Sequence, residues 1–368
     1  MINRVLKITV MMLGISMISL GVTKEIGVNL DLARQYYSVQ VIKKFIDNIS
    51  SSGGNFLHLH ISDDENYGIE SEILGQTTAE AKLEKGIYIN KKTGKKFLSY
   101  AQLKEIIFYA KTKNIELIPE IDSPAHMKAI FELLEMKKGN FYVKNIKSDT
   151  EDEINMEKSE SINFMKQLIG EVTDIFGGKL RHFHIGGDEF EYSEAKNSEF
   201  VKYINDLSNY LISKGIKPRM WNDGITKADI NKINKEIEIT YWSYDGDVED
   251  VKQTGKRRKI RVSVPELLEK GFKVLNYNSY YLYYVPKESK NLKKDIEYSV
   301  NDIKKNWNLT VWDGENSENA VKNEDNIIGA AISIWGEGPY KFTDSEIQKY
   351  SEPLVKTFIL KTQNYKKN

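Results

Sequence analysis

Two neighbouring carboxylates, Asp188 and Glu189, follow Gly186-Gly187 at the end of the short segment His182–Ile185. Adjacent residues of a regular strand point to opposite faces, so both side chains can reach one ligand only if the strand ends there. The two glycines supply the backbone freedom for such a departure. An ionised Asp188 raises the cost of ionising Glu189, and apolar walls would add a desolvation cost in the same direction. A carboxyl group kept protonated near neutral pH can act as a general acid, so the pair predicts acid–base chemistry.

The elements that must position this pair are short apolar segments separated by amphipathic stretches. Within those stretches, apolar residues recur at intervals of three and four, which is typical of helices that bury one face. Strands that alternate with helices imply a parallel sheet, and eight such units in roughly 340 residues predict a single (β/α)8 barrel of the α/β class. A doubly wound open sheet is the alternative, but no G-x-G-x-x-G motif follows the first strand.

The predicted strands are Ile26–Leu32, Phe56–Ile61, Ile115–Ile121, His182–Ile185, Pro218–Trp221, Glu238–Trp242, Lys273–Tyr277 and Ala330–Trp335. The predicted helices are Val39–Ile49, Tyr100–Thr112, Ser161–Phe176, Phe200–Ser213, Pro265–Leu268, Ile296–Trp307 and Ser345–Leu360.

Polar and aromatic residues follow each predicted strand. In a barrel these strand ends converge on one mouth, where catalysis takes place. Carboxylates, indoles and phenols in one cleft are typical of a sugar site, because indole faces stack on the C–H faces of pyranose rings and carboxylates bind the hydroxyls. Trp221, Trp242 and Trp335 each end a strand beside a small polar residue or glycine, which favours a role as pocket walls over ordinary core packing.

The five histidines raise a different class of enzyme. They are His58, His60, His126, His182 and His184. Two H-x-H pairs could indicate a metal-dependent barrel hydrolase. Two such pairs on two strands are not the usual metal pattern, however, so we favour histidines that are hydrogen-bonded inside the barrel and expect neither a metal nor an organic cofactor.

Composition excludes several classes of function. Lys+Arg and Asp+Glu both number 53, so no global field directs the chain to nucleic acid, and no nucleic-acid partner is expected. The chain has no Cys, which excludes disulfides, zinc–thiolate sites and thiol catalysis. The basic stretch Lys252–Arg261 is interpreted as a solvated face, with contact to an anionic ligand as the alternative.

The N-terminal segment predicts export. Arg4 and Lys7 precede an apolar run, Ile8–Val22, and small residues favour cleavage after Gly21. An uncleaved membrane anchor is the alternative, but the run is shorter than the ~20 residues that a span needs. We therefore expect a signal peptide at residues 1–21, a catalytic barrel domain at 22–368, a secreted protein, and no stable membrane association after cleavage.

Three sequence blocks resemble the glycoside hydrolase family 20 of β-N-acetylhexosaminidases. His182 to Glu189 resembles the family's H-x-G-G-D-E signature, and His58–Asp63 and Pro119–His126 resemble two further blocks. Longer segments resemble a biofilm-dispersing branch of the family, and the resemblance runs from about Gly27 to Lys361. Two departures from the wider family are Glu65-Asn66-Tyr67-Gly68 in place of Gln-x-Trp-Arg, and Ala125 in the P-G-H block.

The resemblance implies roles for the matching residues. Glu189 is the general acid/base, Asp188 orients the 2-acetamido N–H of the substrate, and Tyr283 hydrogen-bonds the acetamido carbonyl. The residues implied to line the pocket or to bind sugar hydroxyls are Arg34, Tyr192, Trp221, Trp242, Asp250, Trp335 and Glu337. Asp63 and His126 are implied to support Glu189 from behind. Asp64 and Glu191 are expected to differ even within the biofilm-dispersing branch and to alter the preference for cationic, partly deacetylated sugar.

The resemblance also implies the reaction. It predicts a secreted, monomeric, retaining β-N-acetylglucosaminidase that hydrolyses the β-1,6-linked poly-N-acetylglucosamine of biofilm matrix by substrate assistance. One alternative is a general β-hexosaminidase that acts on chitooligosaccharides or glycan ends. Another is a sugar-binding barrel without catalytic activity.

Overall fold

The computed structural model describes residues 24–177, 180–190, 197–244, 251–313, 319–322 and 324–364. The predicted signal peptide, together with Tyr192, Asp250 and Glu191, lies outside these residues. In the part of the chain that is described, no helix combines the length and apolar character needed to cross a bilayer.

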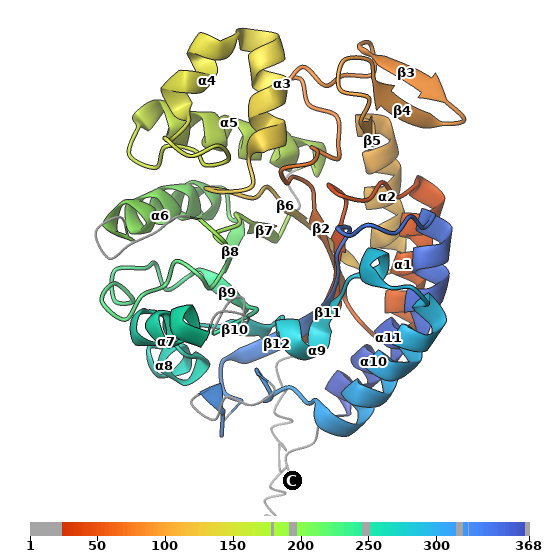
Figure 1. The fold of residues 1–368 in the computed structure, drawn as a ribbon, viewed down its shortest axis with the longest axis vertical. Coiled ribbons are helices and arrows are strands. Elements are labelled where there is room, and N and C mark those ends of the chain that lie inside the picture. The colour runs from red at the N-terminus through yellow and green to blue at the C-terminus, as the bar shows by residue number, and fades with distance from the viewer. Residues whose placement is uncertain are drawn as a thin grey trace, which may run out of the picture.

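Eight parallel strands close into a ring in the order of the chain (Figure 1). The last strand of the ring pairs with the first, in a register that runs from Glu25 opposite Gly329 to Leu30 opposite Ile334. Gly329 permits this closure, because a Cβ there would lie 1.8 Å from the Glu25 carbonyl oxygen. The strands are β1 (Glu25–Asp31), β2 (Phe56–His60), β6 (Glu116–Glu120), β7 (His182–His184), β8 (Lys217–Trp221), β9 (Glu238–Tyr241), β10 (Val274–Asn276) and β12 (Ile327–Ile334). The predicted single (β/α)8 barrel is confirmed.

Alternation along the strands separates two environments. In β2, Leu57 and Leu59 belong to the large apolar cluster between the strands and the helices, whereas His58 and His60 point into the barrel. A second, smaller apolar cluster fills the barrel interior and consists of Phe56, Ile118, Trp221, Leu275, Tyr277, Ala331 and Trp335. This interior cluster forms the floor below the carboxyl ends of the strands.

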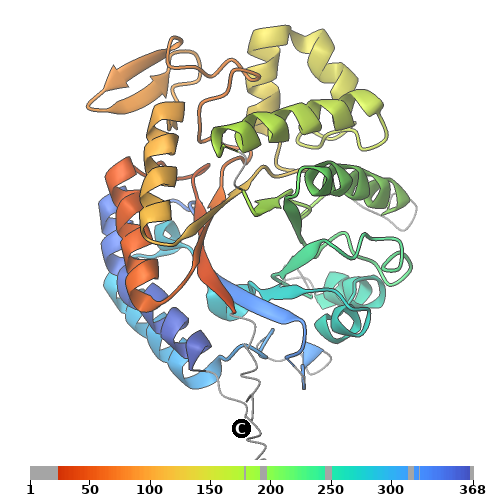
Figure 2. The same cartoon turned by 180° about the vertical axis from the view of Figure 1, so that it is seen from behind.

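Helices surround the ring, and α11 packs against both α1 and α10 on one side (Figures 1 and 2). All seven predicted helices are present, with ends that differ by a few residues. They are α1 (Val39–Ser52), α2 (Tyr100–Thr112), α5 (Ser159–Ile175), α6 (Asn197–Ser213), α8 (Val264–Glu269), α10 (Leu292–Asn306) and α11 (Asp344–Gln363). Most carry one buried apolar stripe, as in α1, where Val41, Ile42, Phe45, Ile46 and Ile49 are buried.

Several elements were not predicted. A three-stranded antiparallel sheet stands outside the barrel, and its first strand is exposed enough to give no alternating apolar pattern (Figure 2). Two short helices are separated by Gly139, which has a φ of 82°. The break at this glycine interrupts the helical pattern, so no helix was predicted there. The unpredicted elements are β3 (Ala81–Glu84), β4 (Ile87–Asn90), β5 (Lys96–Phe97), α3 (Lys128–Lys138), α4 (Asn140–Ile146), α7 (Val251–Ile260), α9 (Ser279–Leu282), β11 (Tyr283–Tyr284) and the 3-10 turn Pro286–Glu288.

Candidate active site

A pocket opens at the carboxyl ends of the strands. Its lining comes from residues at or after the ends of β1, β2, β6, β7, β9 and β12, and from β11. These residues are Arg34, His60, His126, Asp188, Glu189, Trp242, Tyr283, Trp335 and Glu337. The structure therefore brings together, at the barrel mouth, eight of the residues that the sequence assigned to a site, and it adds His60.

The carboxylate pair is presented by a sharp change of backbone direction after β7. Gly186 and Gly187 have φ values of 77° and 105°, and Glu189 has a φ of 48°. Gly186 is required for a second reason, because a Cβ there would lie 2.0 Å from Asp122 Oδ1. Both carboxyl groups thus face the pocket, although they are neighbours in sequence.

The general acid predicted at Glu189 lies in a suitable environment. Its side chain is 58% exposed in the open pocket. Partial burial raises the pKa of Glu189, and the carboxylate of Asp223 adds to this shift, while His126 opposes it. A glutamic acid with a raised pKa retains its proton to higher pH, which suits the donation of a proton to a leaving oxygen.

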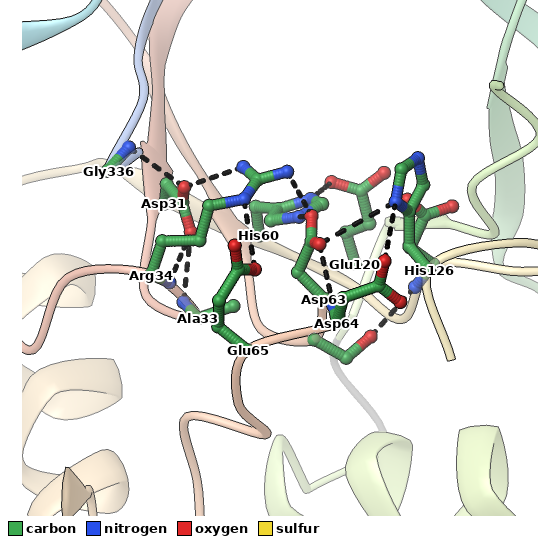
Figure 3. A network of polar contacts seen from close by, with 12 residues as sticks. Asp31, Ala33, Arg34, His60, Asp63, Asp64, Glu65, Glu120, His126 and Gly336 are labelled. Atoms are coloured by element: carbon green, nitrogen blue, oxygen red, sulfur yellow. Dashed lines mark hydrogen bonds and ion pairs between the residues drawn. The ribbon is translucent and has the colours of Figure 1, made fainter. Parts of the chain in front are cut away.

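Two side chains, His126 and Asp63, follow one another behind Glu189, and Figure 3 shows the contact between these two. His126 Nε2 is 3.6 Å from Glu189 Oε2, and His126 Nδ1 is 3.6 Å from Asp63 Oδ1. Burial opposes the charge of His126, but Asp188, Asp63 and Glu189 together raise its pKa. The structure thus places His126 between Glu189 and Asp63, and the support of Glu189 by these two residues stays a prediction.

Arg34 also lines the pocket and is held by four carboxylates, of which Figure 3 labels Asp31, Asp63 and Glu65. It donates to Asp31 Oδ2 at 2.8 Å and to Asp63, and its nitrogens lie 3.4 Å from both Glu65 Oε2 and Glu337 Oε2. These contacts hold the pKa of the guanidinium above its usual range despite burial. A rigid cation next to the partly exposed Glu337 provides both donors and an acceptor for sugar hydroxyls.

Asp31 holds the turns that carry these groups. Its Oδ1 accepts hydrogen bonds from the backbone N–H groups of Ala33 and Arg34, both at 3.0 Å, and its Oδ2 accepts one from Gly336 N at 2.9 Å (Figure 3). Because β1 and β12 are neighbours in the closed ring, one carboxylate can tie together the turns that follow both strands.

Aromatic side chains form one wall. The rings of Trp242 and Tyr283 are stacked, with centroids 6.1 Å apart and planes 12° apart, and Tyr283 meets Trp335 edge-on at 5.4 Å. Burial and the nearby carboxylates raise the pKa of Tyr283 well above its ordinary value, so its hydroxyl remains a hydrogen-bond donor. The wall suits the apolar faces of a sugar ring and offers one phenolic donor.

Trp242 is oriented by an ion pair that sequence reasoning missed. Its indole N–H donates to Asp223, which also binds the guanidinium of Arg261 at 2.6 Å. Arg261 is buried, so the interpretation of Lys252–Arg261 as a solvated face is wrong at this residue. The reason is that the end of α7 turns Arg261 inward toward the carboxylate that follows β8.

The structure does not place Trp221 on the pocket wall. Trp221 is fully buried, is not among the lining residues, and donates its indole N–H to Glu120 Oε1 at 2.7 Å. It lies one layer lower, with its ring 6.2 Å from that of Trp335. As the last residue of β8, it projects into the barrel interior, where it supports the wall from below.

Glu120 is the main residue of the site region that sequence reasoning missed. This fully buried carboxylate accepts from His60 Nδ1 at 2.6 Å and lies 2.7 Å from His184 Nδ1 and 3.2 Å from His58 Nε2. The signal was present in the sequence, because Glu120 is one of two glutamates in a strand whose other residues are apolar. His58, His60 and His184 are hydrogen-bonded inside the barrel, as expected, whereas His126 lines the pocket.

One of these three histidines carries the compensating charge. Burial opposes the charge of His60, but Glu120 and Asp63 raise its pKa well above the ordinary value. Burial lowers the pKa of His58 to about 4 and also lowers that of His184, so both are neutral near pH 7. His60 Nε2 lies 3.0 Å from Asp63 Oδ2, so the imidazolium links the barrel interior to the residue that contacts both Arg34 and His126.

We expect Glu120→Gln to lower the free energy of unfolding by about 3–5 kcal/mol, because it leaves the His60 imidazolium short of a buried counter-charge. Urea unfolding monitored by circular dichroism measures this. Glu105→Gln, which removes an exposed partner of Lys43, is the control and should cost about 1 kcal/mol or less. A Glu120→Gln protein as stable as this control would contradict the assigned network.

The pH dependence of stability follows from the same carboxylate. Burial alone would raise the pKa of Glu120, but His184 and His60 hold it well below the ordinary value. A carboxylate whose pKa is lower in the folded state stabilises the folded protein at pH values above its pKa in the unfolded chain. This contribution to the free energy of unfolding is lost as the pH falls from that value through the lower pKa of the folded state.

The fold and the site define a sugar-processing barrel enzyme, and the comparisons agree with that class. Residues 26–350 match the catalytic domain of glycosyl hydrolase family 20, and the chain belongs to this family.

Individual relatives extend the comparison. The crystal structure of Dispersin B is 55% identical and superposes with a TM-score of 0.90, covering 93% of this chain and all of that chain. Lacto-N-biosidase of Bifidobacterium bifidum is 28% identical over 67% of this chain, and N,N'-diacetylchitobiase of Vibrio harveyi is 30% identical over 50% of it. The matched regions span only 22% and 24% of those two curated proteins.

Proposed function

We propose that this chain is a retaining β-N-acetylhexosaminidase. The observation that carries the proposal is that Asp188 and Glu189 line one pocket together with the stacked rings of Trp242 and Tyr283. Curated members of the family that resemble the chain are named β-hexosaminidases, including those of Vibrio vulnificus and Dictyostelium discoideum.

In the first step, the acetamido oxygen of the bound sugar attacks C1 as the glycosidic bond breaks. Glu189 gives its proton to the leaving oxygen, and His126 lies close enough to stabilise the carboxylate that results. The nucleophile is tethered to the substrate, so little additional entropy is lost on the way to the transition state. The product of this step is a cyclic oxazolinium ion, and no carboxylate forms a covalent bond to the sugar.

In the second step, water attacks C1 of the oxazolinium ion from the side that the leaving group vacated. Glu189 accepts a proton from this water, the C1–acetamide oxygen bond breaks, and the acetamide is restored. Two displacements at C1 retain the anomeric configuration. Throughout, the Asp188 carboxylate accepts a hydrogen bond from the acetamido N–H, and its negative charge stabilises the positively charged oxazolinium ring. The Tyr283 hydroxyl donates a hydrogen bond to the acetamido oxygen.

For the substrate, we propose β-1,6-linked poly-N-acetylglucosamine. The support is the sequence resemblance to the biofilm-dispersing branch and the extent of the likeness to Dispersin B. With this substrate we propose secretion after cleavage at Gly21 and action as a monomer; the charged and apolar pattern of residues 1–22 supports secretion.

A substrate panel tests this proposal. Initial rates on a β-1,6 N-acetylglucosamine oligomer, on a β-1,4 chitooligosaccharide and on an aryl N-acetylglucosaminide should be measured side by side. We expect the kcat/KM for the β-1,6 oligomer to be higher than the kcat/KM for the β-1,4 oligomer. A preference for the β-1,4 oligomer would favour the general hexosaminidase instead, and binding without turnover of any of the three would favour the inactive sugar-binding barrel.

Removal of metal tests the remaining alternative. Several histidine–carboxylate groups are close enough to share an ion, such as His58, Glu120 and His184, but these side chains already contact one another. We expect dialysis against EDTA to leave kcat/KM unchanged. Loss of activity that added Zn²⁺ restores would support the metal hydrolase and contradict the proposed mechanism.

A further inference from the structure

One lysine connects three chain segments at the barrel mouth. Lys287 lies in the 3-10 turn Pro286–Glu288, which follows β11, and its Nζ donates a hydrogen bond to the carbonyl oxygen of Arg34 at 3.0 Å. The carbonyl oxygen of Lys287 accepts a hydrogen bond from Tyr340 N at 2.9 Å. The side chain and the backbone of this residue therefore hold the turn after β11 against the segments that follow β1 and β12.

Each of these three segments carries a residue of the pocket. Arg34 follows β1, Tyr283 begins β11, and Glu337 follows β12. β11 has only two residues and stands outside the closed ring, paired with β12 (Figure 1). So short a strand makes few ladder hydrogen bonds, so the contacts of Lys287 contribute to the spacing between Tyr283 and the other two residues.

The backbone of Lys287 also packs closely against the segment that carries Glu337. Gly338, the next residue after Glu337, has a φ of 119°, which L side chains rarely adopt. A Cβ at this glycine would lie 2.6 Å from the carbonyl carbon of Lys287. The direction in which the chain leaves Glu337 is therefore matched to the position of Lys287.

The local charges explain why this position holds a cation. Four carboxylates surround the guanidinium of Arg34. Three of them also act on the ammonium of Lys287, and these are Asp31, Glu65 and Glu337. Burial lowers the pKa of Lys287, and these three carboxylates oppose the shift. A second positive charge offsets the repulsion among carboxylates that Arg34 alone does not neutralise.

We propose that Lys287 is a positioning residue of the sugar-binding pocket. It holds Arg34 and Glu337, which we call the hydroxyl-binding pair, at a fixed distance from Tyr283, which binds the acetamide. Lys287 acts through these residues, because it is not among the pocket-lining residues that the structure describes. The inference rests on the proposed function, and it means that the pocket recognises the two ends of the sugar ring together.

Substitution by methionine tests this role, because Met has nearly the length of Lys but neither the charge nor a donor. We expect Lys287→Met to raise KM for an aryl N-acetylglucosaminide about tenfold and to leave kcat within about threefold, since binding is weakened more than the chemical step. Lys290→Met, at an exposed residue of the same segment, is the control. An unchanged KM in a folded Lys287→Met protein would overturn the inference.

Circular dichroism and thermal melting show whether the variant folds. If Lys287→Met does not fold, Lys287→Gln replaces it, because Gln stays polar but is too short to reach the same carbonyl oxygen. The same rise in KM is expected for this variant, and an unchanged KM would count against the inference in the same way.

A double-mutant cycle tests whether Lys287 acts through the hydroxyl-binding pair. Glu337→Gln alone should raise KM, and Lys287→Met should then raise it by less than about threefold further. A purely structural role of Lys287 would instead give two effects that multiply, because the two residues would act independently. Multiplying effects would therefore overturn the inference.

Binding measured without turnover keeps this inference separate from the proposed reaction. Titration with N-acetylglucosamine can be followed by tryptophan fluorescence, because Trp242 and Trp335 line the pocket. We expect Lys287→Met to bind the sugar about tenfold more weakly than the wild type. Weaker binding together with no turnover by the wild type would reject the proposed function and support the role of Lys287, whereas equal affinities would overturn that role.

Discussion

Glu189→Gln should lower kcat/KM for a β-1,6 N-acetylglucosamine oligomer by about 10²–10⁴-fold, because the leaving oxygen then departs without a proton. Binding of the oligomer should persist, since Gln keeps the size and polarity of the side chain. Steady-state kinetics and isothermal titration calorimetry measure the two effects. Glu151→Gln, an exposed residue in the loop before α5, is the control.

The choice of leaving group sharpens this test. An aryl leaving group of low pKa departs without protonation, so we expect Glu189→Gln to impair the bond-breaking step for such substrates far less than for the oligomer. Equal losses on both substrates would assign Glu189 a structural role rather than proton donation.

The pH profile gives an independent check on Glu189. Its pKa is raised, and the reaction needs the protonated form, so kcat/KM should fall as the pH rises through this elevated value. The alkaline limb should disappear from the profile of Glu189→Gln. An unchanged limb in the variant would assign it to another group.

Asp188→Asn is the second change with a large expected effect. It should slow turnover of N-acetyl substrates by about 10²–10⁴-fold, because the acetamido N–H and the positive oxazolinium ring both lose a preorganised anion. The comparison substrate is the corresponding glucoside, which has no acetamide. Its slow background hydrolysis should change little between the wild type and the variant.

An equal loss on the glucoside would contradict the assigned interaction between Asp188 and the acetamide. Tyr283→Phe should act in the same selective direction, because only the N-acetyl substrates offer an oxygen for the phenolic hydroxyl.

Much of this site could be predicted because its residues lie at strand ends. A carboxyl end of a parallel strand lies at the barrel mouth whatever the rest of the chain does, so Asp188, Glu189, Trp242 and Trp335 could be grouped from the strand pattern alone. The strand pattern could not predict how far below the barrel mouth each side chain lies. Trp221 is the last residue of β8, and Trp242 directly follows β9, so the two look equivalent in the sequence. The indole of Trp221 nevertheless lies one layer lower in the barrel and donates a hydrogen bond to Glu120.

What escaped prediction depends on contacts between distant segments. Glu120 meets His60 and His184, about sixty residues away on either side, and Arg261 reaches Asp223 across the end of α7. Charge pairs of this kind have no local periodicity. The sheet of β3, β4 and β5 escaped prediction for a different reason. Its first strand is almost entirely exposed, and its strands have only two to four residues, too few to show an alternating apolar pattern.

The central claim is that the acetamide of the sugar, and not an enzyme carboxylate, attacks C1. Retention of configuration alone would not separate these two routes, since both involve two displacements. The most direct measurement is kcat/KM for aryl glucosaminides whose N-acetyl group carries none, one, two or three fluorine atoms. Fluorine withdraws electrons from the acetamido oxygen, so we expect a progressive decline of about 10²-fold or more across the series. A flat series would show that the acetamide is not the nucleophile and would contradict the account.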